Sequence, residues 1–568
     1  MPPPNSTISK PPPPNGERHT LASETELRLE IPPDTTVILT LLSGSAEIFG
    51  SEISPLTNPN GTNATKLTKQ SHVLTGHAKF AIFTWHGCVL DVDVEFGKSL
   101  DISYTSEETA CNVVYVNTHA QLEAMRDEAL GSYLDTTGNS SGGNGNGNTS
   151  GSGSGPRVLV VGPQDSGKTS VAKVLTAYAV KLGRNPMLVD LDVSQNMLSI
   201  PGTIAASSMT HDNITPQANA SSSSIFPNTN SLVLWYGSTD LSKNPDLYKA
   251  LLDKMGQCID LRLATTTTYS SSNNNDANAA AAAANDGNPQ DTHSVDAKSS
   301  GIIVNGCGWI EDMGYELMLH AIQALNINVV LVMGHDRLYS MLTSHFNTMK
   351  EQQLKDESID TSTTATTTTN LSTPKVIKIP RSGGIVSRDS NFRRTSRMFS
   401  MKQYFYGESI VPSTAYTNAA TMASSTSIPS IVTSESISVP SSSLVKQYSP
   451  SLLELNFTDL TLYKLSNVSL SASMLPVSAK QTSEAVQLIP IHDISSSLKH
   501  SMLAVCHPGA VAEFENSGEA SDLYLSGVSG FVVAEKIDME KEIISLLSPC
   551  AGSLPSLTLL LGEITWME

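Results

Sequence analysis

The segment Gly162-Pro163-Gln164-Asp165-Ser166-Gly167-Lys168-Thr169 decides the fold of this 568-residue chain, because it is a complete G-x-x-x-x-G-K-[ST] phosphate-binding loop. The apolar run RVLVV at 157–161 precedes the loop and predicts a strand. The stretch TSVAKVLTAYAVKL at 169–182 follows it with apolar residues at helical spacing. In such a loop, backbone N–H groups and a helix N-terminus cradle phosphates, Lys168 neutralises phosphate oxygens, and Thr169 offers a hydroxyl to Mg²⁺.

Strand-like and helix-like segments alternate after residue 157, which predicts a parallel α/β sheet around the loop. The expected strands are RVLVV (157–161), MLVDLD (187–192), SLVLWYG (231–237), GIIVNGCG (301–308), INVVLVMG (327–334) and KVIKIP (375–380). Between residues 21 and 118, and again after 448, short alternating segments with Gly, Pro and Asn between them predict two β domains.

Biased composition interrupts these segments and sets the expected domain boundaries. Tracts rich in Ser, Thr, Asn, Gly or Ala have too few apolar residues to offset their ordering entropy, so we expect disorder at about 137–155, 206–230, 264–300, 353–373 and 411–446. The expected division is 1–20 disordered, 21–118 N-terminal β domain, 119–156 helix and linker, 157–410 P-loop domain, 411–447 disordered insert and 448–568 C-terminal β domain.

The net charge of -19 argues against a protein that coats nucleic acid, since such a protein needs a broad surplus of Lys and Arg. The six cysteines form no C-x-x-C pair, which argues against a zinc ribbon and favours a reducing compartment. The start MPPPNSTISKPPPPN lacks an apolar signal region, and no run of 18 apolar residues occurs. We therefore expect neither secretion nor membrane spanning.

Asp190 and Asp192 end the strand that follows the phosphate loop and its helix. The two-residue period of a strand places both carboxylates on the same side. In this position one carboxylate is expected to hold the metal, directly or through water, and a carboxylate near the γ-phosphate can accept the proton of an attacking hydroxyl. The alternative is that such an aspartate only caps a helix.

The segment 374–407 concentrates positive charge in an otherwise acidic chain. It has eight Lys and Arg residues against Asp389 alone, for a net charge of +7. Arg393 and Arg397 are four residues apart and share one face of a helix. An arginine pair that closes over a transferring phosphoryl group is one interpretation, and a solvated basic face is the other.

Trp309 follows the fourth expected strand, in Gly306-Cys307-Gly308-Trp309, at the edge where α/β sheets bind ligands. It either stacks on a nucleobase or packs in the core. For Cys307, packing is favoured over catalysis because no histidine forms a recognisable partnership with it.

Taken together, these motifs resemble the Clp-type family of eukaryotic polynucleotide 5′-hydroxyl kinases, which provides the ATP-binding subunit of the pre-mRNA 3′-end cleavage and polyadenylation factor. The resemblance covers nearly all of the chain outside the biased tracts. Its segments are ETELRLEI (24–31), SGSAEIFGSEI (43–53), FAIFTWHGC (80–88), GPQDSGKTS (162–170), LDVSQNMLSIPGTI (191–204), NGCGW (305–309), PRSGGIVSRDSNFRR (380–394), QYFYG (403–407) and GFVVAEKIDMEKEIISLLSP (530–549).

The resemblance implies a fold, ligands and a location. The fold is a central P-loop domain with a parallel sheet, flanked by an N-terminal β domain and a small C-terminal β domain. The ligands are ATP, between the first two domains, with Mg²⁺, and the 5′ end of an RNA. The implied partners are other subunits of the cleavage factor, the implied location is the nucleus, and no membrane is involved.

The resemblance also assigns roles to individual residues. Glu26 and Lys79 correspond to adenine-side contacts, and Asp192 to the metal-side or base aspartate. Gln195 corresponds to a nearby active-site residue, Trp309 to the tryptophan that stacks on the RNA end, and the pair Arg393 and Arg397 to lid arginines. The phosphate loop corresponds to Gly162, Asp165, Ser166, Gly167, Lys168, Thr169 and Ser170.

Two departures from the family pattern bear on activity. Family kinases often have LD-x-GQG where this chain has Leu191-Asp192-Val193-Ser194-Gln195-Asn196, and a family aspartate after the fifth strand is replaced in the run Gly334-His335. Some fungal members of the family bind ATP without kinase activity. A catalytically silent ATP-bound scaffold is therefore the alternative to a kinase, whereas a GTPase is disfavoured because no N-K-x-D motif occurs.

Overall fold

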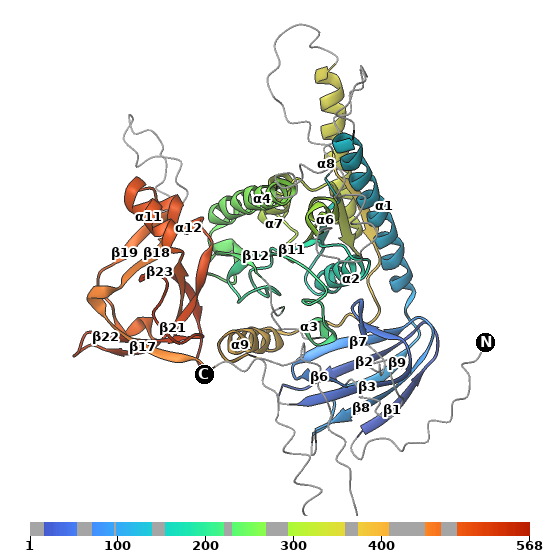
Figure 1. The fold of residues 1–568 in the computed structure, drawn as a ribbon, viewed down its shortest axis with the longest axis horizontal. Helices are drawn as coiled ribbons and strands as arrows, with labels where there is room; N and C mark the ends of the chain where they lie inside the picture. The colour runs from blue at the N-terminus through green and yellow to red at the C-terminus, as the bar shows by residue number, and fades with distance from the viewer. Residues whose placement is uncertain are drawn as a thin grey trace, which may run out of the picture.

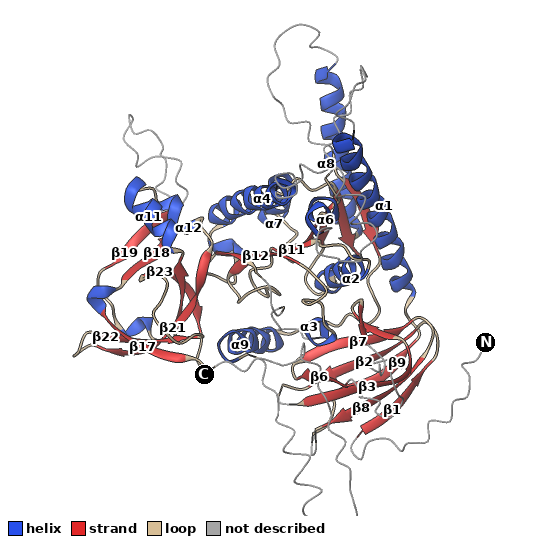
Figure 2. Cartoon of the chain, viewed as in Figure 1, coloured by secondary structure: helices blue, strands red, loops and turns tan. Residues whose placement is uncertain are grey.

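The computed structural model contains an N-terminal β domain, a central α/β domain and a C-terminal β domain (Figure 1). Strands dominate the two outer domains, and helices surround the central sheet (Figure 2). The expected fold class is therefore confirmed. The structure describes residues 16–33, 35–53, 71–95, 98–138, 154–220, 226, 230–268, 293–357, 373–407, 449–466 and 486–567.

The N-terminal domain consists of two antiparallel sheets around one apolar core, with strand orders β1-β8-β3-β6 and β5-β4-β7-β2-β9. Alternate residues of β3, including Val37, Leu39 and Leu41, point into this core, as expected for strands with one buried face. The strands are β1 (Gly16–Leu21), β2 (Thr25–Ile31), β3 (Thr36–Gly44), β4 (Ala46–Ile48), β5 (Ser51–Ile53), β6 (Ser71–Thr75), β7 (Ala78–Thr84), β8 (Cys88–Val94) and β9 (Ile102–Ser106).

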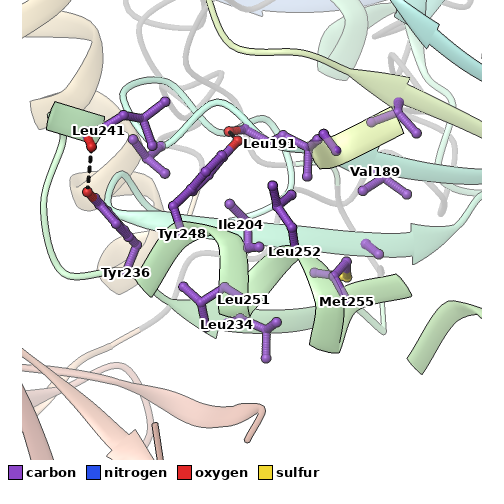
Figure 3. Close-up of a cluster of buried hydrophobic side chains, with 14 of the residues drawn as sticks. Val189, Leu191, Ile204, Leu234, Tyr236, Leu241, Tyr248, Leu251, Leu252 and Met255 are labelled. Atoms are coloured by element: carbon purple, nitrogen blue, oxygen red, sulfur yellow. Dashed lines mark hydrogen bonds between the residues drawn. The ribbon is translucent and has the colours of Figure 1, made fainter. Parts of the chain in front are cut away.

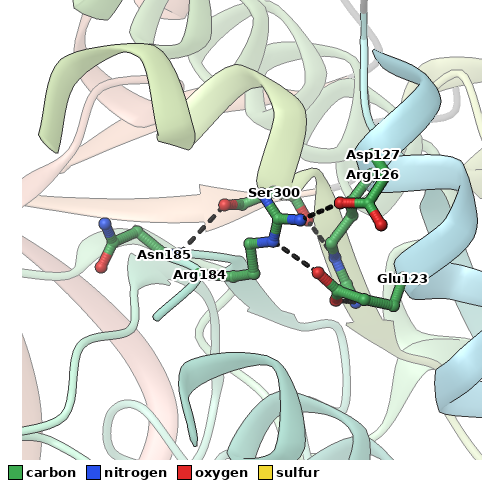
Figure 4. A network of polar contacts seen from close by, with 6 residues as sticks. All are labelled: Glu123, Arg126, Asp127, Arg184, Asn185 and Ser300. Atoms are coloured by element: carbon green, nitrogen blue, oxygen red, sulfur yellow. Dashed lines mark hydrogen bonds and ion pairs between the residues drawn. The ribbon is translucent and has the colours of Figure 1, made fainter. Parts of the chain in front are cut away.

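Helix α1 (Ala110–Gly138) leads from the N-terminal domain along the central domain, to which a polar network attaches it (Figure 4). The Nε of Arg184 donates to Glu123 Oε1 over 2.5 Å, and the Nε of the fully buried Arg126 donates to the carbonyl oxygen of Ser300 over 3.0 Å. Hydrogen bonds to charged groups are the stronger kind, so these contacts fix α1 in place.

The central domain is built on a seven-stranded sheet of order β13-β12-β11-β14-β10-β15-β16. Strands β11, β14, β10, β15 and β16 are parallel to one another, so their carboxyl ends share one edge. The expectation of an entirely parallel sheet is corrected at β12, which is antiparallel to both β11 and β13. The strands are β10 (Arg157–Val161), β11 (Met187–Asp190), β12 (Thr203–Ser208), β13 (Leu232–Trp235), β14 (Ile302–Asn305), β15 (Val329–Met333) and β16 (Lys375–Ile379).

Helices cover this sheet and bury a large apolar core beside β11 (Figure 3). In this core the Tyr248 hydroxyl donates to the carbonyl oxygen of Leu191 over 2.9 Å, which fixes the chain just after β11. The helices of the domain are α2 (Lys168–Lys181), α3 (Pro216–Ala220), α4 (Pro245–Thr268), α6 (His293–Ser300), α7 (Met313–Ala324), α8 (Asp336–Glu357) and α9 (Ser390–Tyr406).

The C-terminal domain contains a seven-stranded sheet of order β17-β22-β21-β20-β23-β18-β19. It also contains the helices α11 (Pro508–Ser517) and α12 (Ala520–Tyr524), which the prediction of a β domain after residue 448 did not include. The strands are β17 (Ser451–Asn456), β18 (Thr461–Ser466), β19 (Gln487–Ile491), β20 (Ser501–Cys506), β21 (Val528–Asp538), β22 (Ile543–Ser548) and β23 (Thr558–Thr565).

The C-terminal domain holds the end of α9. Phe405 of α9 stacks on Trp566 with ring centroids 5.1 Å apart, and both side chains are buried. The Tyr404 hydroxyl accepts a hydrogen bond of 3.0 Å from the backbone N–H of Phe531 on β21. Burying two large aromatic rings is worth several kcal/mol, so this end of α9 is firmly anchored.

Several tracts expected to be disordered contain ordered structure at their edges. Residues 16–20 form most of β1, residues 206–220 contain the end of β12 and all of α3, and residues 293–300 form α6. Helices α1, α4 and α8 also extend into such tracts, up to residues 138, 268 and 357. Tertiary contacts supply the apolar burial that these segments lack locally, as Ala220 of α3 shows by packing in the core of the N-terminal domain. Most of the remainder of these tracts, including 411–446, lies outside the described residues.

Candidate active site

The phosphate loop connects β10 to α2 as the sequence predicts. Three of its residues have positive φ: Gly162 (156°), Asp165 (53°) and Gly167 (92°). The positive φ of Gly167 favours glycine, and the segment before α9 comes close to it, because a Cβ at Gly167 would lie 2.5 Å from Ile385 Cδ1. The Ser166 hydroxyl is buried without a hydrogen-bond partner among the described residues. Such an orphaned group at a helix N-terminus suits a phosphate.

Lys168 begins α2 and faces the carboxylates of the site. Its Nζ donates to the Pro163 carbonyl oxygen over 2.8 Å. Burial lowers the pKa of Lys168, and the charge of Asp192 is the largest influence in the opposite direction. Thr169 and Ser170 line the same cavity as Lys168. The loop therefore presents its cation and hydroxyls together.

Asp190 and Asp192 do not share one side of a strand, which corrects the expectation from period two. Strand β11 ends at Asp190, whose side chain is fully buried and accepts from the backbone N–H of Asp192 (3.0 Å) and of Met197 (2.8 Å) and from Asn305 Nδ2 (2.9 Å). These hydrogen bonds hold a turn that redirects the chain after β11. Burial, with the nearby Asp192 charge, raises the pKa of Asp190 to about 7. Asp190 therefore organises the loop.

Asp192 is the carboxylate that reaches the cavity. Its Oδ1 accepts from the backbone N–H and the hydroxyl of Ser194, at 2.9 and 2.7 Å. Thr169 and Asp192 are the two protein ligands expected for Mg²⁺, and no group of three or more His, Cys, Asp or Glu side chains able to hold a metal occurs within the described residues. That donor set fits Mg²⁺, which usually takes one or two carboxylates together with substrate phosphates and water.

The two lid arginines reach the cavity from α9, as their i, i+4 spacing predicts. Arg393 Nη2 pairs with Asp165 Oδ2 of the phosphate loop at 2.6 Å. The same carboxylate oxygen accepts from the backbone N–H of Arg388 over 3.1 Å. Burial and the charges of Arg393 and Arg394 lower the pKa of Arg397. Unfavourable burial of several cations at one place favours an anionic ligand there.

The N-terminal domain closes the other end of the cavity. Glu26 on β2 and Lys79 on β7, the two residues predicted to contact adenine, both line it. Lys79 Nζ pairs with Glu30 at 2.6 Å and lies 4.8 Å from the ring centroid of Phe392 on α9. Burial raises the pKa of Glu26, and its hydrogen bond with Arg28 is the largest influence that lowers it. Strand β2 thus places a buried carboxylate and its counter-charge at this end.

Trp309 and Gln195 line the cavity on the side of the central domain. Trp309 is half-buried at the carboxyl end of β14 and packs against the apolar core with part of its surface. Core packing and exposure to the cavity therefore coexist, and its stacking on a base stays a prediction. Cys307 is also packed, and burial raises the pKa of its thiol to about 11, which argues against a nucleophile at neutral pH.

The residues that replace the family glycines fit the backbone. Neither Ser194 nor Asn196 has positive φ. The buried Asn196 side chain accepts from the backbone N–H groups of Leu198 and Ser199, at 2.8 and 3.0 Å. At the other departure, His335 Nδ1 accepts from the Leu338 N–H over 3.0 Å and so caps α8. These departures support the local structure.

All the predicted site residues except Gly162 line one cavity of about 1000 Å³ between the N-terminal domain, the phosphate loop and helix α9. Gly162 stands at the start of the loop itself. Among the lining residues that reasoning from sequence did not assign to the site are Arg28, Tyr104 and Arg388. The available signal for Arg28 was its two-residue distance from Glu26 in a predicted strand. Arg388 lies in the basic segment 374–407 but was not singled out within it, and Tyr104 had no comparable signal. Among the described residues, no helix is long and apolar enough to cross a membrane.

The fold and the phosphate loop define a P-loop protein. Family models match most of the chain. They are the N-terminal beta-sandwich domain of polyadenylation factor at 20–129, the mRNA cleavage and polyadenylation factor CLP1 P-loop within 162–365, and the pre-mRNA cleavage complex II protein Clp1 at 448–568. The chain therefore belongs to the Clp1 family.

Individual relatives match along their full length. The "Protein CLP1 homolog" of Arabidopsis thaliana is 30% identical over 96% of this chain and 94% of its own. The "Polyribonucleotide 5'-hydroxyl-kinase Clp1" of Danio rerio is 28% identical over 98% and 95%. Among solved structures, one of a wild-type Clp1p–Pcf11p complex matches with a TM-score of 0.64 at 18% identity, covering 97% of this chain and 98% of that chain. At that identity, the structural match shows the fold alone.

Proposed function

We propose that this chain is an ATP-binding subunit of the nuclear pre-mRNA 3′-end cleavage and polyadenylation machinery and that it transfers the γ-phosphate of ATP to the 5′-hydroxyl of RNA. The observation that carries the proposal is the convergence of Lys168, Asp192, Arg393, Arg397 and Trp309 on one cavity. Relatives named polyribonucleotide 5′-hydroxyl-kinase Clp1 in Danio rerio and Macaca fascicularis support the same reaction.

The residues divide the work of phosphoryl transfer, which consists largely of positioning and electrostatic stabilisation. The phosphate loop holds the phosphates of ATP through backbone N–H groups. Lys168 and the lid pair Arg393 and Arg397 neutralise charge on the transferring group. Asp192 accepts the proton of the attacking 5′-hydroxyl or holds the metal, and Trp309 orients the RNA end by stacking.

Mg²⁺, held by Thr169 and Asp192, would supply charge neutralisation of the phosphate oxygens. Selectivity for the base of the nucleotide depends on protein side chains. Glu26 and Lys79 are positioned to receive the adenine, because they line the cavity on the side of the N-terminal domain. The proposed partners of the chain are an RNA 5′ end and other subunits of the cleavage factor.

The test is transfer of labelled γ-phosphate from ATP to an oligonucleotide with a 5′-hydroxyl. We expect Lys168→Ala to lower the transfer rate by about 10²–10³, the usual cost of one such electrostatic contact. Lys375→Ala is the matched control, since Lys375 is exposed on the edge strand β16 and lies outside the cavity lining. Equal labelling by wild type and Lys168→Ala would reject the kinase.

The second candidate is a catalytically silent scaffold that retains ATP and presents a surface to other subunits. The Arg393–Asp165 ion pair favours it, because this pairing withholds a lid arginine from the phosphates. A scaffold would carry nucleotide through purification and show no Mg²⁺-dependent phosphorylation of 5′-hydroxyl RNA. Release of the pair in Asp165→Asn would then leave that activity absent.

A further inference from the structure

Arg28 is a buried cation at the base end of the cavity. Its side chain projects from β2, two residues after Glu26, and the residue is only 8% exposed. The Nε donates to Glu26 Oε1 over 2.5 Å, and Nη1 donates to the Tyr104 hydroxyl over 3.3 Å. The guanidinium also lies 5.6 Å from the centroid of the Tyr104 ring. These contacts fix Arg28 and thereby orient the Glu26 carboxylate.

The other side of the guanidinium meets the segment that leads into the lid. A Cβ at Gly384 would lie 2.8 Å from Arg28 Nε and 3.1 Å from its Cζ. The next residue, Ile385, packs against Gly167 of the phosphate loop. A short chain of contacts therefore joins Glu26, through Arg28 and the lid segment, to the loop that holds the phosphates.

The ionisation of the Glu26 carboxyl group depends on the positive charge of Arg28. A carboxylate in this position loses hydration, and the nearby Glu108 adds a repulsive charge. Both effects raise the pKa of Glu26, whereas the hydrogen bond and the charge of Arg28 lower it. Without Arg28, the pKa of Glu26 would rise further, and the buried carboxylate would accept a proton more readily.

We propose that Arg28 determines base selectivity by holding Glu26 as an ionised hydrogen-bond acceptor, which suits the exocyclic amino group of adenine. The inference rests on the proposed function, in which Glu26 faces the base of ATP. A protonated Glu26 is a donor, and the group at the same position of guanine is a carbonyl oxygen, which accepts. Loss of Arg28 therefore favours GTP at the expense of ATP.

The test measures binding of fluorescent ATP and GTP analogues to the full chain. We expect Arg28→Met to lower the ratio of ATP to GTP affinity by roughly tenfold or more. The reason is that a protonated Glu26 no longer accepts from the amino group of adenine and instead donates to the carbonyl oxygen of guanine. Glu26→Gln should shift the ratio in the same direction. The matched control is Arg18→Met, because Arg18 forms a comparable pair with Asp91, at 2.7 and 2.9 Å, in the same domain but outside the cavity lining.

A second variant keeps the inference testable if Arg28→Met does not fold. Gly384→Ala should displace the guanidinium and lower the same affinity ratio, whereas Gly131→Ala, which has open space around it, should not. An unchanged ratio in Arg28→Met, or in Gly384→Ala, overturns the inference while leaving the proposed kinase intact. Equal weakening of both nucleotides also overturns it. A wild-type protein that binds neither nucleotide overturns both proposals.

Discussion

The two β domains contact the same helix and contribute to the cavity in different ways. The N-terminal domain supplies Glu26, Arg28, Lys79 and Tyr104 to the lining and touches the start of α9, where His77 stacks on Phe392 with centroids 4.1 Å apart. The described residues of the C-terminal domain supply none of that lining, and Trp566 holds the opposite end of α9. One domain therefore lines the cavity, and the other anchors the helix that carries Arg393 and Arg397.

The largest effect should come from breaking the anchor. Trp566→Ala removes a side chain that is 3% exposed and stacked on Phe405, so we expect a loss of about 3–5 kcal/mol of stability. Chemical denaturation followed by circular dichroism measures the loss. ATP binding by the folded variant should change little, and Met567→Ala, which alters an exposed neighbour, is the control. A variant as stable as wild type would show that the C-terminal domain is no anchor.

A smaller effect is expected where the N-terminal domain touches α9. His77→Ala removes the stack on Phe392 and a 3.0 Å contact between His77 Nε2 and the Phe392 carbonyl oxygen. The expected cost is about 1–2 kcal/mol, expressed mainly as a higher KM for ATP because the lid loses a contact beside Lys79. Steady-state kinetics separate KM from kcat. A fall in kcat alone, at unchanged KM, would contradict this expectation and show that His77 does not support ATP binding.

The smallest effect concerns pH. Burial, followed by the charge of Arg126, lowers the pKa of His119 on α1 to about 4, and burial also lowers the pKa of His77. Between about pH 6.5 and 4, each of these two histidines therefore binds a proton more readily in the unfolded chain than in the folded chain, so their contribution to stability falls as the pH drops from 6.5 towards 4. Because His119 lies on α1, hydrogen exchange at pH 7 and 5 should show greater loss of protection in α1 than in β21. His119→Gln should reduce that difference.

Several residues that line the cavity could be predicted because they belong to motifs that are local in the sequence. The phosphate loop, Asp192 and the spacing of Arg393 and Arg397 each depend on residues close in sequence, and all reach the cavity. The role of Asp190 was not predictable, since its turn with Asp192 depends on Asn305, 115 residues away. Strand β12 was missed because its sequence TIAASS contains a single bulky apolar residue, Ile204, among small residues that do not mark a buried strand.

The anchor of α9 was equally beyond reach from sequence. The stretch QYFYG reads as the amphipathic end of a helix, and nothing within it identifies Trp566 as the partner of Phe405. Such pairings depend on packing between segments that lie far apart along the chain. Helices α11 and α12 were missed because they are short segments among strands.

The network that attaches α1 has a consequence for the covalent continuity of the chain. Arg126 and Arg184 bind α1 to the central domain through contacts that do not involve residues 139–153. A protease that cuts between Gly138 and Ser154 would therefore leave two fragments that stay together. We expect the nicked protein to run as two bands on a denaturing gel and to elute as one species in native buffer. The two fragments could then also be expressed separately and recombined.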